Sequence, residues 1–387
     1  MASIELVGVT KRFGKVTALK NVSLEVNDKE FFVLFGPAGA GKTTILNIIA
    51  GIHVPDEGVV KMNGEIVNQI EPQDRNVAMV FENYALYPHL RVYDNIASPL
   101  RSPRHKKDEA FIKEAVERVA ALLKIDQLLD RLPIQLSNGQ RQRVAIGRAL
   151  VRYPNVYLMD EPLAHLDAKL RNLMRGELKI IQSNFDTTSI YVTHDFMEAM
   201  SLSDRIAVIN EGEIVQVGTS DEIYYLPGNE FVAQLMGNPE INLIEGKLEI
   251  TGSSYRVSLK GFDEAFELPQ DDNVYEKLKE YNGSNLRIGI RPQNVNYSFE
   301  PDDGFVKGSV NAFETIGNKS VLTALMGGDT EVRIITPNGL LVKLDQEVFV
   351  ELDMTQTLFF NAETTELICR YNEAAVRSLT ADQAKEA

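Results

Sequence analysis

FFVLFGPAGAGKTTILNIIA, residues 31–50, is the stretch that decides the fold of this 387-residue chain. Its first five residues are all apolar and predict a buried strand. The next eight fit the pattern G-x-x-x-x-G-K-[ST], in which glycines allow backbone N–H groups to surround phosphate oxygens. Residues 42–50 predict a helix that Gly51 closes. The stretch therefore predicts a strand, a phosphate-binding loop and a helix whose N-terminus favours an anion.

The loop is predicted to bind the phosphates of a nucleotide, and a purely structural glycine turn is the alternative. Lys42 would supply positive charge to the β and γ phosphates, and the Thr43 hydroxyl would bind Mg²⁺. The expected ATP-binding residues of this loop are Gly36, Pro37, Ala38, Gly39, Ala40, Gly41, Lys42, Thr43 and Thr44.

Two adjacent carboxylates end a second apolar strand, VYLMDE at residues 156–161. Acids at the end of a buried strand are costly unless they bind a cation or water. Downstream of a phosphate-binding loop, Asp160 is predicted to hold Mg²⁺ through water, and Glu161 to act as general base toward the attacking water. Further apolar strands at 189–193 and 205–209, with a helix over 108–125, predict an α/β domain with a largely parallel sheet.

Charge and composition exclude several classes of protein. The chain has 40 Lys+Arg and 55 Asp+Glu, a formal net charge of −15, and so lacks the basic excess of a non-specific nucleic-acid binder. It has no run of about 18 apolar residues, so no membrane span is predicted. The only cysteine, Cys369, permits no internal disulfide and fits a reducing compartment.

The sequence pattern changes after about residue 236. Short alternating stretches at 247–250, 255–259, 287–290, 332–335 and 348–352, separated by turn residues, predict a small all-β barrel or sandwich. A hinge is predicted at Gly237-Asn238-Pro239. The expected divisions are a nucleotide-binding domain over 1–236, a β-rich domain over 237–372 and a short helical or frayed tail over 373–387.

A third motif carries a family resemblance. The segment LSNGQ, residues 136–140, precedes an Arg-rich helix and resembles the LSGGQ signature of ATP-binding-cassette (ABC) ATPases. Other segments then resemble cassette motifs in order: Phe13 the aromatic that stacks on adenine, 80–96 the Q-loop region, 163–167 the D-loop and His194 the switch histidine. The β-rich tail resembles the regulatory domain of maltose-type importer ATPases.

The resemblance implies an α/β P-loop NTPase domain with antiparallel β and helical subdomains, followed by an all-β, OB-like (TOBE) regulatory barrel. Two cassettes would pair head to tail, each ATP lying between one subunit's loop and the other's signature. The residues implied to act on the partner's ATP are Ser137, Asn138, Gly139, Gln140 and Asp167. The implied catalytic residues are Lys42, Glu82, Glu161 and His194, and the implied Mg²⁺ ligands are Thr43, Glu82 and Asp160.

The resemblance also implies an activity and a set of partners. The chain would be the ATPase subunit that energises an importer for a sugar, polyol or related solute. It would sit at the cytoplasmic face of the inner membrane, held there by two multispanning permease subunits, with a periplasmic or lipid-anchored solute-binding protein as an indirect partner. A homodimer and a heterodimer with a related cassette both remain open. A soluble ABC ATPase and a slowed partner cassette are the alternative functions.

Two residues depart from the family pattern. Glu82 stands where the family has Gln, and Asn138 replaces the first glycine of the signature. An ionised Glu can ligate Mg²⁺ but cannot donate a hydrogen bond as Gln can. Asn tolerates a left-handed backbone better than most residues. Tolerated variation with working hydrolysis and a slowed site are both consistent with this pattern.

Overall fold

The computed structural model describes residues 2–103, 106–152, 154–164, 166–185, 187–317, 319–373 and 376. The chain divides into two compact units, Met1–Ser220 and Asp221–Ala387. In the described ranges, no helix has the length and apolar character needed to cross a membrane.

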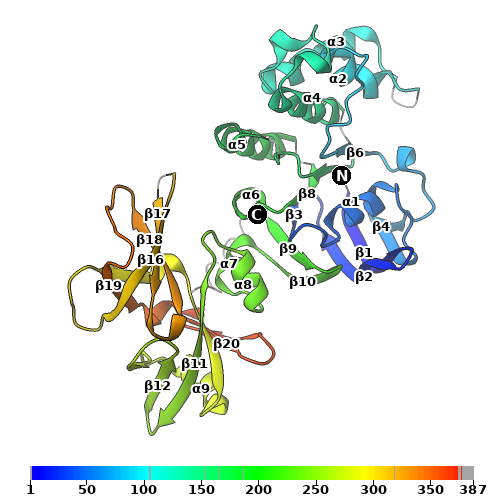
Figure 1. Ribbon diagram of the computed structural model, residues 1–387. Coiled ribbons are helices and arrows are strands. Elements are labelled where there is room, and N and C mark those ends of the chain that lie inside the picture. The colour runs from blue at the N-terminus through cyan, green and yellow to red at the C-terminus, as the bar shows by residue number, and fades with distance from the viewer. Residues whose placement is uncertain are drawn as a thin grey trace. The chain divides into compact units, whose positions relative to one another are not determined.

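A six-stranded sheet forms the centre of the first unit (Figure 1). Its spatial order is β10 (Glu213–Gly218), β9 (Arg205–Asn210), β3 (Phe31–Phe35), β8 (Thr188–Thr193), β7 (Val156–Asp160) and β6 (Val77–Val80). All neighbours are parallel except β10, which runs antiparallel to β9. Every residue of β3, β7 and β8 is buried, as expected for parallel strands covered on both faces. The predicted largely parallel sheet is confirmed.

The helix expected after the glycine-rich loop is α1 (Lys42–Ala50). Gly51 ends it with a φ of 83°, and its N–H donates to the carbonyls of Asn47 and Ile48. A left-handed residue after the last turn is a common helix ending, which glycine adopts without steric cost. The predicted bounds of this helix are confirmed.

The N-terminal strands of the unit form a second, antiparallel sheet. Its order is β2 (Val16–Val26), β1 (Ile4–Phe13), β4 (Glu57–Met62) and β5 (Glu65–Ile66). Ile4 pairs with Val26 and Leu6 with Leu24, and all four side chains are buried in one core. The residue pattern alone did not predict these strands; the family resemblance implied an antiparallel subdomain.

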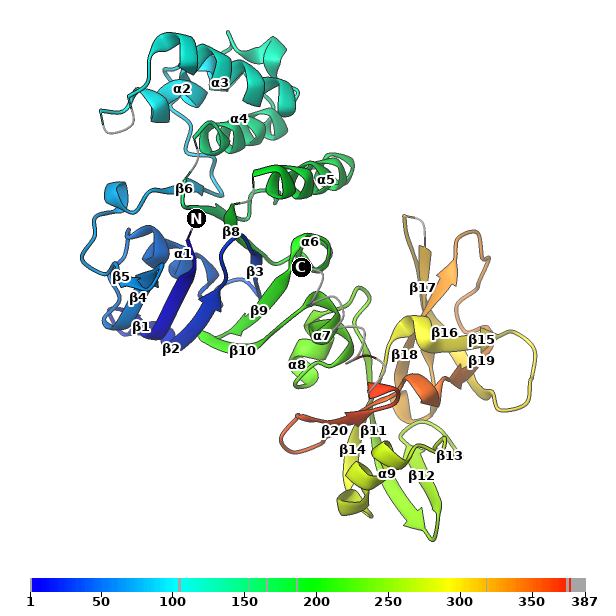
Figure 2. The same cartoon turned by 180° about the vertical axis from the view of Figure 1, so that it is seen from behind.

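Three helices gather beyond the β6 edge of the central sheet, as both ribbon views show (Figures 1 and 2). They are α2 (Val92–Arg101), α3 (Glu109–Leu122) and α4 (Asn138–Leu150). The Asp108 side chain accepts a hydrogen bond from the N–H of Phe111 at 2.9 Å and so begins α3. Two further helices of this unit are α5 (Ala168–Phe185) and α6 (Phe196–Leu202).

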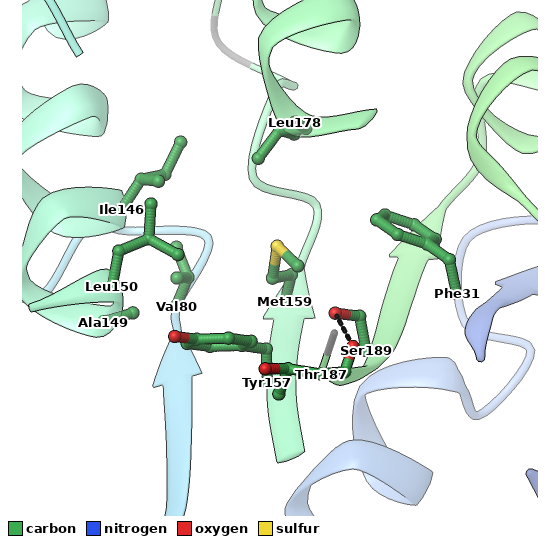
Figure 3. Close-up of a pocket in the computed structure, with 10 residues that line it drawn as sticks. All are labelled: Phe31, Val80, Ile146, Ala149, Leu150, Tyr157, Met159, Leu178, Thr187 and Ser189. Carbon is green, nitrogen blue, oxygen red and sulfur yellow. Dashed lines mark hydrogen bonds between the residues drawn. The ribbon is translucent and has the colours of Figure 1, made fainter. Parts of the chain in front are cut away.

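A small apolar gap lies where α4 and α5 meet the sheet (Figure 3). Leu150 of α4, Met159 of β7 and Leu178 of α5 are among the residues that line it. Its volume of about 20 Å³ is close to that of one water molecule, so the gap is a packing defect and not a ligand site.

The second unit contains two antiparallel sheets around one apolar core. The first has the order β13 (Ala265–Glu267), β12 (Ser254–Leu259), β11 (Asn242–Thr251), β14 (Asn285–Ile290), β20 (Leu358–Asn361) and β21 (Leu367–Arg370). The second has the order β15 (Val295–Ser298), β19 (Glu347–Leu352), β16 (Val306–Ile316), β17 (Lys319–Leu325) and β18 (Glu331–Pro337). The strands expected beyond residue 236 are therefore present. The unit also contains α7 (Ser220–Tyr225), α8 (Glu230–Leu235) and α9 (Asp272–Leu278).

Packing places the division between the units after Ser220 instead of residue 236. Ala233 of α8 lies in one apolar cluster with Phe360 of β20. Arg370 donates to the carbonyl of Tyr225 at 2.8 Å. These two helices therefore pack on the β-rich unit, which the change in strand pattern after about residue 236 does not show. The tail expected over 373–387 falls almost entirely outside the described residues.

Candidate active site

A cleft of about 630 Å³ lies at the carboxyl ends of the central strands. It is lined by Ala18, Pro37, Ala38, Gly39, Gly41, Lys42, Thr43, Thr44, Glu82, Glu161 and His194. The glycine-rich loop follows β3, Glu161 follows β7 and His194 follows β8, and these three strands are neighbours. Carboxyl ends of parallel strands meet at one edge of a sheet, where ligands bind in open α/β folds. The topology thus brings the predicted loop, base and histidine together.

Two glycines fix the path of the phosphate-binding loop. A Cβ on Gly36 would lie 2.2 Å from the carbonyl oxygen of Ile209. Gly41 has a φ of 107°, and a Cβ there would lie 2.8 Å from the carbonyl oxygen of Ala18. Side chains do not fit at either position, so the sequence pattern has a steric cause.

The Lys42 ammonium is held at the loop by backbone carbonyls. Its Nζ donates to the oxygens of Gly36 and Pro37 at 2.9 Å each, and lies 3.8 Å from Oε1 of Glu161. Burial lowers the pKa of Lys42, while the carboxylates of Glu161 and Asp160 act in the opposite direction. Backbone carbonyls of the loop therefore position the cation.

Asp160 and Thr43 place two oxygen-bearing side chains, which could serve as metal ligands, in the same region. The Thr43 hydroxyl donates to Oδ1 of Asp160 at 3.0 Å. The pKa of Asp160 is raised to about 6, chiefly by burial and also by the nearby charges of Glu161 and Glu82, although the hydrogen bond from Thr43 and the charge of Lys42 act in the opposite direction. A cation would offset this accumulation of negative charge. Carboxylate and hydroxyl oxygens are ligands that suit Mg²⁺, so these residues fit such an ion.

Glu161 and His194 are in direct contact. Nδ1 of His194 lies 2.9 Å from Oε2 of Glu161. Glu161 has a φ of 43°, and its N–H donates to the carbonyl of Val192 at 3.1 Å. Non-glycine residues in this conformation store backbone strain, which concentrates at functional sites. The pair has the geometry of a carboxylate base oriented by a second group.

Phe13, the last residue of β1, lies outside the core. Its side chain is 44% exposed, and its ring meets the edge of His53 with centroids 5.2 Å apart. Lys11 Nζ lies 5.4 Å from the ring centroid. An aromatic residue in a strand is commonly a core residue. The exposed ring of Phe13 is instead available to stack on a ligand.

The signature segment begins α4, away from the cleft. Ser137 is the N-cap: its Oγ accepts from the N–H of Gln140 at 3.3 Å, and Gln140 Oε1 accepts from the N–H of Ser137 at 3.0 Å. Asn138 is the first residue of the helix and is not among the residues with positive φ. The expectation that Asn138 is tolerated for its left-handed backbone is therefore wrong, because a helical position makes no such demand.

The residues expected to act on a partner's ATP do not line this chain's own cleft. Of the described lining residues, none is Ser137, Asn138, Gly139, Gln140 or Asp167. Ser137, Asn138 and Asp167 are exposed. Asp167 directly precedes α5, and its carbonyl accepts from the N–H of Arg171 at 2.8 Å. These exposed side chains remain accessible to a second molecule.

Sequence reasoning missed two residues that shape the segment after Glu82. Asn95 is fully buried, and its side chain binds backbone groups of Tyr87 at 2.8 and 3.0 Å. Arg148 of α4 donates to the carbonyls of Tyr84 and Ala85 at 3.1 and 2.8 Å. A groove of about 730 Å³ lies beside them. A polar residue in an amphipathic helix normally indicates a solvent-facing position, so the sequence contains no clear signal for either role.

Comparison with known proteins gives a consistent result. Residues 19–164 match the family described as ABC transporter. The chain is 42% identical over 383 residues to the trehalose/maltose import ATP-binding protein MalK of Thermococcus litoralis, covering 95% of this chain and 100% of that protein. It is 42% identical over 334 residues to the sn-glycerol-3-phosphate import ATP-binding protein UgpC of Chromobacterium violaceum, covering 86% of this chain and 87% of that protein. A dimeric ATP-binding cassette solved in a post-hydrolysis state with ADP and Pi aligns with a TM-score of 0.52 and 30% identity, over 56% of this chain and 98% of that one.

Proposed function

This chain belongs to the ATP-binding proteins of the ABC transporter family, and from that premise we propose that it is the ATP-hydrolysing subunit of an importer for a sugar, polyol or related solute. The cleft that joins Lys42, Glu161 and His194 is the observation that carries the proposal. The names of the relatives support import as the process that the hydrolysis drives.

The residues of the cleft divide the chemistry of hydrolysis among them. Glu161 accepts a proton from the attacking water, and His194, 2.9 Å from it, orients the water toward the γ-phosphate. Lys42 and the loop N–H groups offset the negative charge that develops on the phosphate oxygens. Phe13 offers its exposed ring to the adenine.

Mg²⁺ is the ion that Thr43, Asp160 and Glu82 are proposed to hold. The hydrogen bond between Thr43 and Asp160 and the raised pKa of Asp160 support the assignment. When bound, the ion neutralises phosphate charge.

A second cassette, either a copy of this chain or a related chain, is proposed to complete each ATP site. Ser137, Asn138, Gly139, Gln140 and Asp167 would contact the ATP held by the partner's loop. Their separation from the cleft of their own chain supports this arrangement, as does the dimeric form of the similar solved cassette. A hydroxyl and N–H groups at a helix N-terminus suit contact with a phosphate.

The remaining partners are proposed to be two multispanning permease subunits, which would hold the chain at the cytoplasmic face of the inner membrane. The groove lined by Ala85, Tyr87 and Arg148 supports contact with such a subunit. A periplasmic or lipid-anchored solute-binding protein would act indirectly. The β-rich second unit, proposed as an OB-like regulatory domain, contains none of the cleft residues.

Co-purification from membranes tests the importer proposal. Tagged chain expressed with its native neighbours should retain a multispanning protein, and the complex in vesicles should hydrolyse ATP faster when solute and its binding protein are added. A matched Ala85→Glu variant should lose the membrane protein but keep basal hydrolysis, because Ala85 lies outside the ATP cleft. Full hydrolysis with no membrane partner would instead favour a soluble ABC ATPase.

Glu82→Gln should keep or raise ATP hydrolysis, with the larger gain at low Mg²⁺. The substitution removes one of the negative charges near Asp160 and introduces a hydrogen-bond donor. At saturating Mg²⁺ we expect a change of less than about threefold, or ~0.7 kcal/mol. Steady-state rates over a Mg²⁺ titration, with the permease present, provide the measurement.

The control for this change is Glu71→Gln, which removes an exposed charge that does not line the cleft. It should leave the Mg²⁺ dependence unaltered. A tenfold or greater fall in Glu82→Gln would contradict the prediction and give the carboxylate an essential role. A large gain would favour a natively slowed cassette.

A further inference from the structure

One guanidinium group, that of Arg171 in the first turn of α5, lies between two segments of the active site. On one side it contacts the segment 163–167. Its Nη2 donates to the carbonyls of Ala164 and Leu166 at 3.4 and 3.1 Å. The backbone N–H of Arg171 donates to the carbonyl of Asp167 at 2.8 Å. The side chain and the helix start together hold three carbonyls of this segment.

On its other side the same group contacts the residues that follow His194. Nη1 of Arg171 donates to Oδ2 of Asp195 at 3.3 Å. Its Nε lies 3.9 Å from Oε1 of Glu198, whose side chain is 3% exposed. Leaving a buried carboxylate without its cationic neighbour is costly. Arg171 therefore interacts with both acids of this segment.

The two acids fix the backbone on both sides of His194. Oδ1 of Asp195 accepts from the N–H groups of Met197 and Glu198 at 2.8 and 3.1 Å and caps α6. The Thr193 hydroxyl accepts from the N–H of Asp195 at 3.0 Å and donates to Glu198 at 2.7 Å. The histidine thus stands between two residues of one hydrogen-bond network.

The segment 163–167 is also hydrogen-bonded to Glu161, the residue whose side chain contacts His194. The N–H of Ala164 donates to the carbonyl of Glu161 at 3.2 Å. A closed ring of contacts therefore runs from Glu161 through Ala164, Arg171 and Asp195 to His194, and returns through the 2.9 Å contact between the two side chains. Besides the backbone hydrogen bond from Glu161 to Val192, Arg171 joins the two halves of this ring through its side-chain contacts.

We propose that Arg171 is a positioning residue that sets the contact between Glu161 and His194 by joining the segment 163–167 to the segment that carries His194. The inference rests on the proposed ATP hydrolysis. Arginine suits the task because its planar fork binds several acceptors at once, whereas a lysine ammonium is a flexible point charge. Among the described residues, the hydrogen bonds and ion pairs of the Arg171 side chain do not include the phosphate-binding loop or Lys42.

The test compares Arg171→Lys with Lys179→Met in the full chain. Lys179, two turns further along α5, donates to the carbonyl of Leu202 at 2.9 Å and to Asp204 at 3.3 Å. It ties α5 to the end of α6 without reaching the cleft, and so controls for lost packing. We expect kcat to fall about 10- to 100-fold in Arg171→Lys, with KM and the Kd for ATP within about twofold, and to change less than about twofold in Lys179→Met.

A double-mutant cycle with His194→Ala separates positioning from general damage. If Arg171 acts through the Glu161–His194 contact, Arg171→Lys should cost less than about twofold in the His194→Ala background, because that contact is already lost. Equal costs in both backgrounds, or a fall in kcat that follows the loss of Tm in all variants, would overturn the proposal. Absence of hydrolysis in the unmodified chain would instead overturn the proposed function.

Asp195→Asn provides a second variant should Arg171→Lys fold poorly. Asn is a good N-cap and keeps an acceptor for the N–H groups of α6. Its amide nitrogen, placed where Oδ2 now lies, cannot accept from Arg171. The same fall in kcat, and the same loss of effect in the His194→Ala background, are expected. A kcat within twofold of the unmodified chain would overturn the proposal.

Discussion

Glu161→Gln should lower ATP turnover by about two to four orders of magnitude, the usual contribution of a general base. The amide keeps the shape of the side chain but does not accept the proton from water. ATP binding should persist, because the loop and Lys42 are unchanged, and the bound dimer should accumulate in its closed form. Steady-state hydrolysis, ATP binding and gel filtration with Mg²⁺ and ATP measure these three effects.

The matched control is Glu211→Gln. Glu211 also follows a central strand, and its φ of 45° is close to the 43° of Glu161, but it is exposed and does not line the cleft. Removing the carboxylate of a residue with positive φ should by itself leave ATP turnover within about twofold of the unmodified protein. Turnover in Glu161→Gln within tenfold of the unmodified protein would remove Glu161 from its role.

Mixing two inactive variants should restore activity if Ser137 acts on the partner's ATP. Lys42→Ala removes the loop cation, and Ser137→Asp keeps an N-cap acceptor while placing a negative charge against the γ-phosphate. The ATP turnover of each variant alone should fall about 10²- to 10³-fold, which is the usual effect of removing one charge-stabilising group. In a mixed dimer one site carries both defects and the other carries neither.

Random exchange of an equal mixture makes half of the dimers mixed, each with one intact site. If the sites act independently, the mixture should therefore recover about a quarter of the original rate. Mass spectrometry of differently tagged chains verifies subunit exchange. No recovery despite verified exchange would contradict either the shared site or the independence of the two sites. A Ser137→Asn chain, which keeps the cap without the charge, serves as the control.

Local sequence predicted the parts of the site that a short stretch of backbone determines. The loop after β3 is fixed by glycines where a Cβ would clash, and Glu161 follows a wholly buried strand. Such features are visible in consecutive residues. The bounds of α1 could be predicted for the same reason, because an apolar helical stretch ends at Gly51.

Features that depend on distant parts of the chain were not predicted. Arg171 and Arg148 occupy polar positions on helices, which a sequence pattern assigns to solvent, whereas folding places them against Asp195 and against the carbonyls of Tyr84 and Ala85, which lie far along the chain. The change in strand pattern near residue 236 does not reveal that α7 and α8 pack on the β strands of the second unit, which begins at Asp221. The role expected of Asn138 failed since helix geometry, and not residue type, sets its backbone.

The two carbonyl contacts of Lys42 also bear on the energy state of the cell. The contacts of its ammonium and the conformations of the loop glycines are set by groups of this chain. Because ADP has the same α and β phosphates as ATP, we expect the loop to bind both nucleotides. In the proposed dimer, contact between the second cassette and the γ-phosphate would then distinguish ATP from ADP. A falling ATP-to-ADP ratio is therefore expected to slow hydrolysis, because ADP competes with ATP for the same loop.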